Sequence, residues 1–213
     1  IDGSAQNGGL PPGELDMTGG GLTVTNGLDV AGTLLLQGDP PTFTSYGTSI
    51  VESTGEIIAQ GAGTVVEFMP DPSNPNPTFV LVSNFGLIAA ESGGLVEFLE
   101  TSVTNEAAAT STAQPGLIES IGAGSLVLFE GGSTLDNGGT VAAKDGGTIE
   151  FLHAGTVMNE PRSNSGGVEA APGEIESTGA AIIFTDTDLD NFGGVTASNF
   201  GTITFSGATI VNE

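Results

Sequence analysis

The chain has 213 residues, of which 38% are hydrophobic, enough to form one substantial core in a single domain. Its 26 acidic residues outnumber two basic ones, and the formal net charge of -24 excludes nucleic acid and anionic membrane surfaces as partners. The absence of cysteine excludes disulfides and thiolate metal sites, and no apolar run approaches the roughly 18 residues needed for membrane insertion.

Charged residues make up only 13% of the chain, so its surface must consist mostly of Thr, Ser, Asn and Gly. Acidic, cysteine-free, glycine-rich chains are similar in composition to exported bacterial surface proteins. We therefore expect an extracellular or cell-surface location in a bacterium. The first residues, Ile1-Asp2-Gly3-Ser4, have neither the basic region nor the apolar run of a signal peptide, so we expect a mature form or a piece of something longer.

Residues 1–19 lack regular alternation and contain Pro11-Pro12, which predicts an irregular N-terminal cap or linking arm. From residue 20 onward the chain repeats, and a fixed repeat decides the fold. The clearest marker is a short segment ending in asparagine, and these asparagines are Asn26, Asn84, Asn105, Asn137, Asn159, Asn191 and Asn212. The last six are separated by 21, 32, 22, 32 and 21 residues. This spacing indicates coils of 21 or 22 residues, two of which carry an insertion.

A second marker is an aliphatic residue two positions before a phenylalanine, and it keeps the same register. Its phenylalanines are Phe68, Phe98, Phe129, Phe151, Phe184 and Phe205. A third segment follows some of the asparagines, as in Val141-Ala-Ala143, and glycine-rich turns such as Asp145-Gly-Gly147 separate the segments. Each coil therefore has three short alternating strands, and no helical period occurs.

These features predict an all-β fold, a right-handed parallel β-helix of about seven to eight coils over residues 20–213. Equivalent strands of successive coils would pair about 4.8 Å apart. Left-handed β-helices repeat on hexapeptides, about 18 residues per turn, so the longer coil favours the right-handed form. Leucine-rich repeats would need a different consensus and a helix.

Alternation along the strands predicts which side chains point inward. Val66 and Phe68 share one face and Glu67 lies on the other, so the phenylalanines should stack from coil to coil. The asparagines also have inward parity and mark a corner. Asparagine tolerates the left-handed backbone of such a corner, and its amide can bond to the asparagine one coil away. We interpret both columns as structural ladders rather than as ligand sites.

Three segments interrupt the coils without disturbing the columns on either side. They are loops at residues 69–77, 106–115 and 160–172. Repeat proteins often bind partners through such loops, so they are the candidate contacts for a glycan or protein ligand. The alternative is that they are decorations or contacts between subunits.

Catalytic chemistry is nearly missing from the sequence. Parallel β-helices include polysaccharide lyases and hydrolases, which need clustered carboxylates beside basic groups. The chain offers only His153, Lys144 and Arg162, in predicted turns and a loop. We therefore predict neither enzyme activity nor a cofactor, and a polysaccharide-active enzyme is a third alternative only if acids from adjacent coils converge in a groove.

One acidic cluster is a candidate metal site. Alternation places Asp186, Asp188 and Asp190 on one outward face, about 7 Å apart in series. Such carboxylates repel one another unless they are solvated or bridged by a hard cation such as Ca²⁺. A calcium site is one interpretation, and a solvated acidic stripe is the other.

The run Gly-Gly-Thr-Val-Ala-Ala-Lys-Asp-Gly-Gly-Thr-Ile-Glu-Phe at residues 138–151 resembles the repeats of very long bacterial surface proteins, of the adhesin, haemagglutinin-like or autotransporter-like class. The resemblance extends over residues 20–213 and implies an extracellular structural role, as a building block of a filament, sheath, matrix or adhesin stalk. The alternative function is an adhesin that binds glycan or protein. The last coil closes at Asn212 without a cap, so we expect either further coils or end-to-end stacking of copies.

Overall fold

The structure, a computed structural model, describes residues 13–74, 80–108, 114–160 and 172–212. These residues form 24 strands in three parallel sheets of eight strands each. They contain no helix, and therefore none that is long and apolar enough to cross a membrane.

The three sheets run along the whole molecule. Sheet A contains, in spatial order, β1 (Glu14–Met17), β4 (Thr33–Leu36), β7 (Glu56–Gln60), β10 (Leu87–Glu91), β13 (Leu117–Ile121), β16 (Thr140–Lys144), β19 (Glu174–Thr178) and β22 (Gly194–Ser198). Sheet B contains β2 (Gly21–Val24), β5 (Thr42–Ser45), β8 (Val65–Phe68), β11 (Leu95–Leu99), β14 (Leu126–Glu130), β17 (Thr148–Leu152), β20 (Ala181–Thr185) and β23 (Thr202–Ser206). Sheet C contains β3 (Asp29–Val30), β6 (Ser49–Val51), β9 (Val80–Asn84), β12 (Thr101–Asn105), β15 (Thr134–Asn137), β18 (Val157–Asn159), β21 (Leu189–Asn191) and β24 (Ile210–Asn212).

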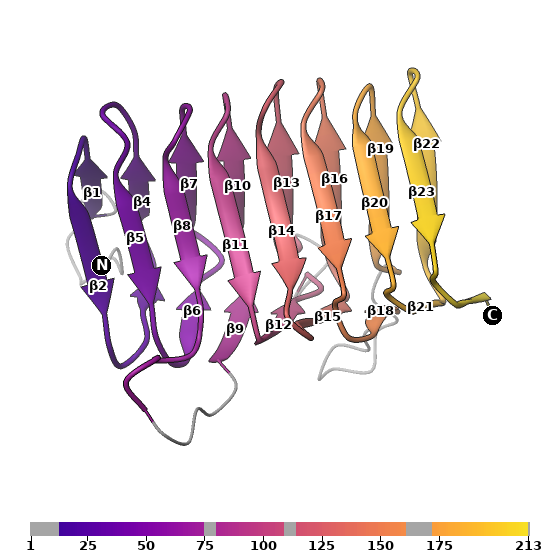
Figure 1. The fold of residues 1–213 in the computed structure, drawn as a ribbon, viewed down its shortest axis with the longest axis horizontal. Helices are drawn as coiled ribbons and strands as arrows, with labels where there is room; N and C mark the ends of the chain where they lie inside the picture. Colours follow the sequence, from indigo (N-terminus) through magenta and orange to yellow (C-terminus); the bar gives the residue numbers. More distant parts are fainter. Residues whose placement is uncertain (1–12, 75–79, 109–113, 161–171, 213) are drawn as a thin grey trace.

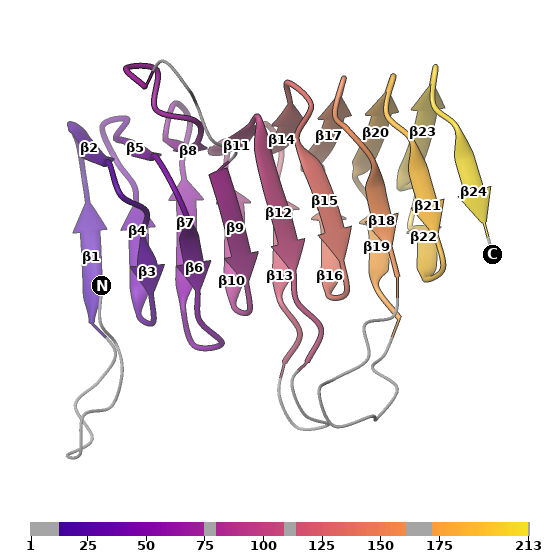
Figure 2. The same ribbon diagram turned by 90° about the horizontal axis from the view of Figure 1, so that it is seen from below.

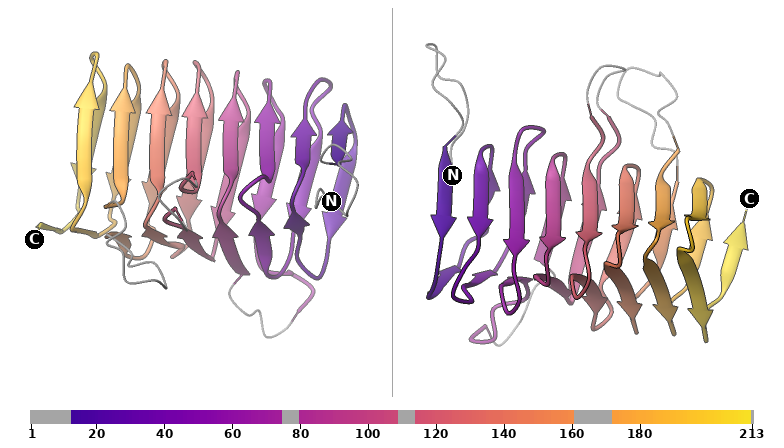
Figure 3. Two further views of the ribbon diagram at one scale, coloured as in Figure 1. Left: turned by 180° about the vertical axis from the view of Figure 1, so that it is seen from behind. Right: turned by 90° about the horizontal axis from the view of Figure 1, so that it is seen from above.

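Each coil contributes one strand to each sheet before the chain returns to the first. Consecutive coils lie side by side along the long axis (Figure 1), and the same order is seen after a quarter turn (Figure 2). The first and last described strands lie at opposite ends of the row (Figure 3). This arrangement of eight coils confirms the predicted parallel β-helix with three strands per coil.

The first coil begins earlier than the sequence predicts. β1 pairs with β4, with Glu14 opposite Thr33, so residues 14–17 already belong to the solenoid, although the sequence predicts an irregular segment over residues 1–19. Residues 1–12 lie outside the part that the structure describes. The first two coils do not show the repeat pattern because they lack the phenylalanine and asparagine that mark the later coils. Ser45 occupies the register of Phe68, and Val51 that of Asn84.

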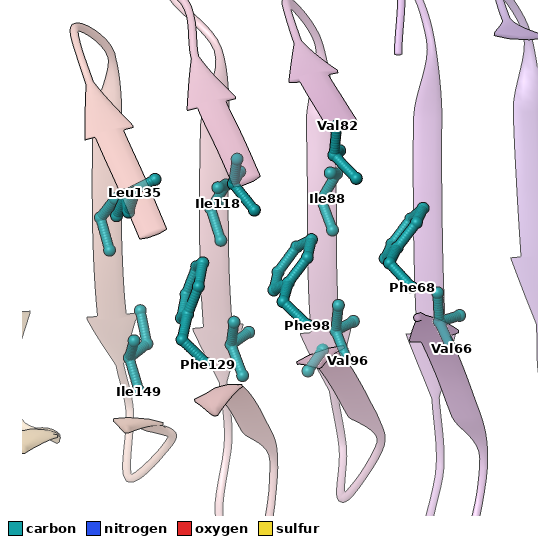
Figure 4. Close-up of a cluster of buried hydrophobic side chains, with 14 of the residues drawn as sticks. Val66, Phe68, Val82, Ile88, Val96, Phe98, Ile118, Phe129, Leu135 and Ile149 are labelled. Atoms are coloured by element: carbon teal, nitrogen blue, oxygen red, sulfur yellow. The ribbon is translucent and has the colours of Figure 1, made fainter. Parts of the chain in front are cut away.

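The core lies inside the coils, where alternate side chains of all three sheets meet. Val66, Phe68, Val96 and Phe98 are fully buried, and Figure 4 shows them repeating from one coil to the next with Phe129. At these inward positions, in-register pairing places valine beside valine and phenylalanine beside phenylalanine. Burying one such side chain stabilises the fold by about 1.5–3 kcal/mol, so stability is spread along the stack.

Candidate functional site

The six predicted phenylalanines form one continuous stack inside sheet B. Neighbouring rings are nearly parallel, with centroids 4.6 to 5.2 Å apart in the pairs from Phe68–Phe98 to Phe184–Phe205. All but Phe205, on the last strand of the sheet, are fully buried. Close stacking and complete burial make this column a packing element, with no room at its centre for a ligand.

Six of the seven predicted asparagines form a hydrogen-bonded column at the end of sheet C. Each Nδ2 donates to the Oδ1 of the asparagine in the next coil. The distances are 2.8 Å for Asn84 to Asn105, Asn105 to Asn137 and Asn137 to Asn159, 2.7 Å for Asn159 to Asn191, and 2.6 Å for Asn191 to Asn212. The amides also bond to the backbone, as in the 3.0 Å bond from Asn105 Nδ2 to the Thr140 carbonyl. The column therefore satisfies its own buried polar groups.

Asn26 does not belong to this column, and its assignment to the ladder is wrong. It lies exposed between β2 and β3, while Val30 and Val51 occupy the ladder register of the first two coils. The segment ending in Asn26 mimics the marker because it alternates in the same way. Its Leu22, however, lies in sheet B opposite Phe43.

The asparagine column explains a second column, of glycines, at the next corner. A Cβ on Gly139 would overlap the Gly116 carbonyl and would lie 2.8 Å from Asn105 Nδ2. A Cβ on Gly173 would lie 2.5 Å from Asn159 Oδ1. Only glycine leaves room for the amides where the backbones of successive coils approach so closely.

The three aspartates of the calcium hypothesis diverge. Asp186 lies at the corner between β20 and β21, Asp188 immediately precedes β21, and only Asp190 lies on β21. Asp188 Oδ1 accepts a bond of 3.0 Å from the backbone N–H of Thr209. Within the described ranges, no three His, Asp or Glu side chains are grouped so that they could hold a metal ion. The geometry therefore gives the calcium hypothesis no support.

His153 occupies a corner with a left-handed backbone, where each of the later coils turns from sheet B to sheet C. Glu100, Gly131, His153, Asp186 and Gly207 hold this position in successive coils, with φ between 47° and 68°. His153 Nδ1 lies 3.3 Å from Asp186 Oδ2, and 66% and 58% of their side chains are exposed. The position agrees with the predicted turn at His153, and a contact between two side chains so exposed contributes little to stability.

The three predicted contact loops lie partly outside the described residues, which lack 75–79, 109–113 and 161–171 and therefore Arg162. In the first loop, Asp71 Oδ1 accepts bonds from Ser73 Oγ and from the Ser73 backbone N–H, at 2.6 and 2.8 Å. These two bonds lower the pKa of Asp71. A ligand role for the loops stays a prediction.

A groove crosses four coils on the outer face of sheet A. Its floor is a straight line of outward side chains, Glu56, Leu87, Leu117 and Thr140, which are opposite one another in β7, β10, β13 and β16. Residues 53–55, Phe85, Gln114 and Pro115 also line the groove. It encloses a cavity of about 390 Å³, within the range typical of small-ligand pockets.

One end of this groove carries the only lysine of the chain. Lys144 follows Thr140 on the outer face of β16, and its Nζ lies 2.9 Å from Glu119 Oε2. Only 9% of the Glu119 side chain is exposed, whereas 39% of the Lys144 side chain is. The buried carboxylate therefore fixes the ammonium in place, and two of its three N–H donors remain for other acceptors.

A separate acidic group lies on the outer face of sheet B. Glu67 and Glu97 are opposite each other on β8 and β11. Burial, together with a hydrogen bond to Glu130 and the negative charges of Glu130 and Glu67, raises the pKa of Glu97 to about 7. The Glu97 carboxyl therefore keeps its proton to a higher pH than an ordinary glutamate does.

Sequence reasoning missed both the groove and this carboxyl group. The sequence pattern was aligned on residues that point inward, and the outward residues served only to show which face of each strand is buried. Aligning the residues before Ile88 and Ile118 would have placed Leu87 and Leu117 at one outward position in successive coils. Two large apolar side chains at such a position are the signal that could have located the groove floor.

Comparison with known proteins adds little to this picture. No protein-family model matches the sequence, and no curated protein matches it. One solved structure, that of a TibC-catalyzed hyper-glycosylated TibA fragment, is similar over 94% of this chain and 92% of that chain, with 13% identity and a TM-score of 0.22. At that TM-score the similarity carries no argument about function, which therefore rests on the geometry of this chain.

Proposed function

We propose that the protein is a non-catalytic structural β-solenoid of a bacterial cell surface, a building block of a filament, sheath, matrix or stalk. The observation that carries the proposal is the continuity of the repeated columns. The phenylalanine stack and the asparagine ladder run uninterrupted through the last six coils to β23 and β24. Most of the buried side chains therefore serve the rod itself.

The ends of the three sheets supply the means of assembly. Among the described residues, β22, β23 and β24 are the outermost strands of the three sheets at one end, and β1, β2 and β3 are the outermost strands at the other. Edge strands present backbone groups that can pair with further parallel strands. A second copy that adds its first coil to the last coil of another would extend the rod by a contact that does not close.

Ala197 in β22 provides a selective test. Gly194 donates to the Gly173 carbonyl and Ser198 accepts from the Gly179 N–H, so both of these residues face β19. Because hydrogen bonding alternates along a parallel strand, the N–H of Ala197 points away from β19 toward the open edge. Ala197→Pro removes a donor needed by an incoming strand without breaking a bond inside the chain. Ala197→Ser is the matched control, because serine occurs at the same register in Ser120 and Ser177.

The assay is sedimentation velocity over a concentration series, combined with negative-stain electron microscopy. We expect wild type and Ala197→Ser to form rods several copies long and Ala197→Pro to remain monomeric with unchanged circular dichroism. A wild-type chain that stays a monodisperse monomer at high concentration would contradict end-to-end assembly. Equal assembly of the proline variant would show that the β22 edge is not the contact.

A further inference from the structure

The groove on sheet A has the dimensions of a site for an elongated small ligand. Four residues in adjacent strands, from Glu56 to Thr140, span three interstrand spacings of about 4.8 Å, or about 14 Å. Such a line runs along the rod axis, across the strands. A ligand lying in it would contact one side chain from each coil, and the regular spacing of the coils would set its length.

The chemistry of the groove combines an apolar floor with polar groups at both ends. Leu87 and Leu117 form the middle of the floor, and Phe85 stands beside them. Glu56 lies at one end, where it accepts a 3.1 Å bond from Thr33 Oγ1, and Thr140 and Lys144 lie at the other. Pyranose rings present apolar C–H faces edged by hydroxyl groups that donate and accept hydrogen bonds. A short sugar chain matches this pattern along its length.

Charge and hydrogen bonding disfavour the other ligand classes. The net charge of -24 repels an anionic ligand, and the ammonium of Lys144 is already neutralised by Glu119. An extended peptide binds best by adding a strand to a sheet edge. The groove floor lies in the middle of sheet A, where β10 and β13 are paired on both sides, so no backbone edge is open to a peptide.

We propose that this groove binds a neutral oligosaccharide, with its apolar ring faces on Leu87 and Leu117 and its hydroxyls on Glu56, Thr140 and Lys144. This activity goes beyond the structural role and does not depend on it. A rod unit with such a groove would attach along its side to a polysaccharide, leaving its ends for assembly. The order of chemistry along the groove, from carboxylate to ammonium, gives the bound chain one preferred direction.

The test titrates the intact chain with a panel of neutral di- and trisaccharides of different linkage, followed by saturation-transfer NMR and calorimetry. Leu117→Glu places a carboxylate in the groove floor. Leu126→Glu is the matched control, because both leucines begin a strand of the same coil, face outward, and have a leucine and a threonine as neighbours. We expect Leu117→Glu to weaken binding by about tenfold or more and Leu126→Glu to leave it unchanged.

Two results would overturn the proposal. One is the absence of saturable binding to any member of the panel by wild type. The other is equal binding by Leu117→Glu, with both variants matching the wild-type circular dichroism. Ala197→Pro, which is expected to block assembly, should bind sugar normally, so failure of the groove and failure of the structural role give different outcomes. Trigalacturonate serves as the anionic probe, and we expect it to bind more weakly than a neutral trisaccharide of the panel.

Discussion

Replacing Asn137 by alanine tests whether the asparagine ladder stabilises the solenoid. Asn137 is fully buried in the middle of the column. Its Oδ1 accepts from Asn105, and its Nδ2 donates to Asn159 Oδ1 and, at 3.1 Å, to the Glu174 carbonyl. The alanine variant loses all three bonds and leaves a small cavity.

The expected loss of stability depends on which hydrogen-bonding groups are left without a partner. A buried hydrogen bond contributes about 1 kcal/mol net, and a buried acceptor left without a partner costs about 1–3 kcal/mol. Asn105 Nδ2 keeps its bond to the Thr140 carbonyl, but Asn159 Oδ1 loses the donor from Asn137. We therefore expect Asn137→Ala to lower the free energy of unfolding by about 3 kcal/mol. At the exposed end of the ladder, Asn212→Ala removes one bond that water can replace, and should cost less than about 1 kcal/mol.

The measurement is urea unfolding followed by far-UV circular dichroism, with hydrogen exchange to locate the destabilised coils, because a repeat protein need not unfold in one step. Protection should fall most in the coils on either side of Asn137. If the two variants differ by less than about 0.5 kcal/mol, the buried ladder contributes no more than a surface contact, and the reasoning fails.

Three further predictions concern the phenylalanine stack, Glu97 and the glycine column. Phe129→Ala should destabilise the fold by about 3–5 kcal/mol in urea unfolding, because its ring is buried between two others, whereas Phe205→Ala at the end of the stack should cost clearly less; equal losses would contradict the stacking argument. The pKa of Glu97, raised from an ordinary 4.5 to about 7, means that the folded chain holds a proton that the unfolded chain releases, so wild-type stability should fall as pH rises from about 4.5 to 7. Glu97→Gln should reduce that fall, and identical urea midpoints of the two proteins at both pH 5 and pH 8 would refute the shift. Gly139→Ala should lower the melting temperature strongly, because its Cβ would overlap backbone of the preceding coil, and a melting temperature equal to that of wild type would disprove the overlap.

The later six coils could be predicted from the sequence because their inward positions repeat chemically distinct residues. Phenylalanine and asparagine recur at one parity, and parallel pairing keeps like beside like. The first two coils could not be predicted in this way. Their core is built from aliphatic residues such as Leu34 and Leu36, which carry no marker that distinguishes one register from another.

The candidate sites could not be predicted from alternation along the sequence alone. Alternation correctly placed Asp186 and Asp190 at outward positions, but it did not show that the chain turns between them. The groove depends on Glu56, Leu87 and Thr140, which belong to coils separated by insertions of unequal length. Their proximity results from pairing between coils, which is a property of the folded sheet and of no local segment.

The asparagine ladder also has a direction. Every amide nitrogen from Asn84 to Asn191 donates toward the C-terminal coil, so the small dipoles of the side chains point the same way and reinforce one another. The two ends of the series are chemically unlike: Asn84 begins it in the third coil, where its Oδ1 accepts from the Gly86 N–H, and Asn212 ends it in the last described coil, where its Oδ1 accepts from Asn191. In copies joined head to tail, Val30 and Val51 of the next copy would follow Asn212 in the ladder register, so each copy would carry its own run of the ladder, pointing the same way as the run before it. The ladder thus gives a fibre of head-to-tail copies a side-chain polarity that recurs once in every copy.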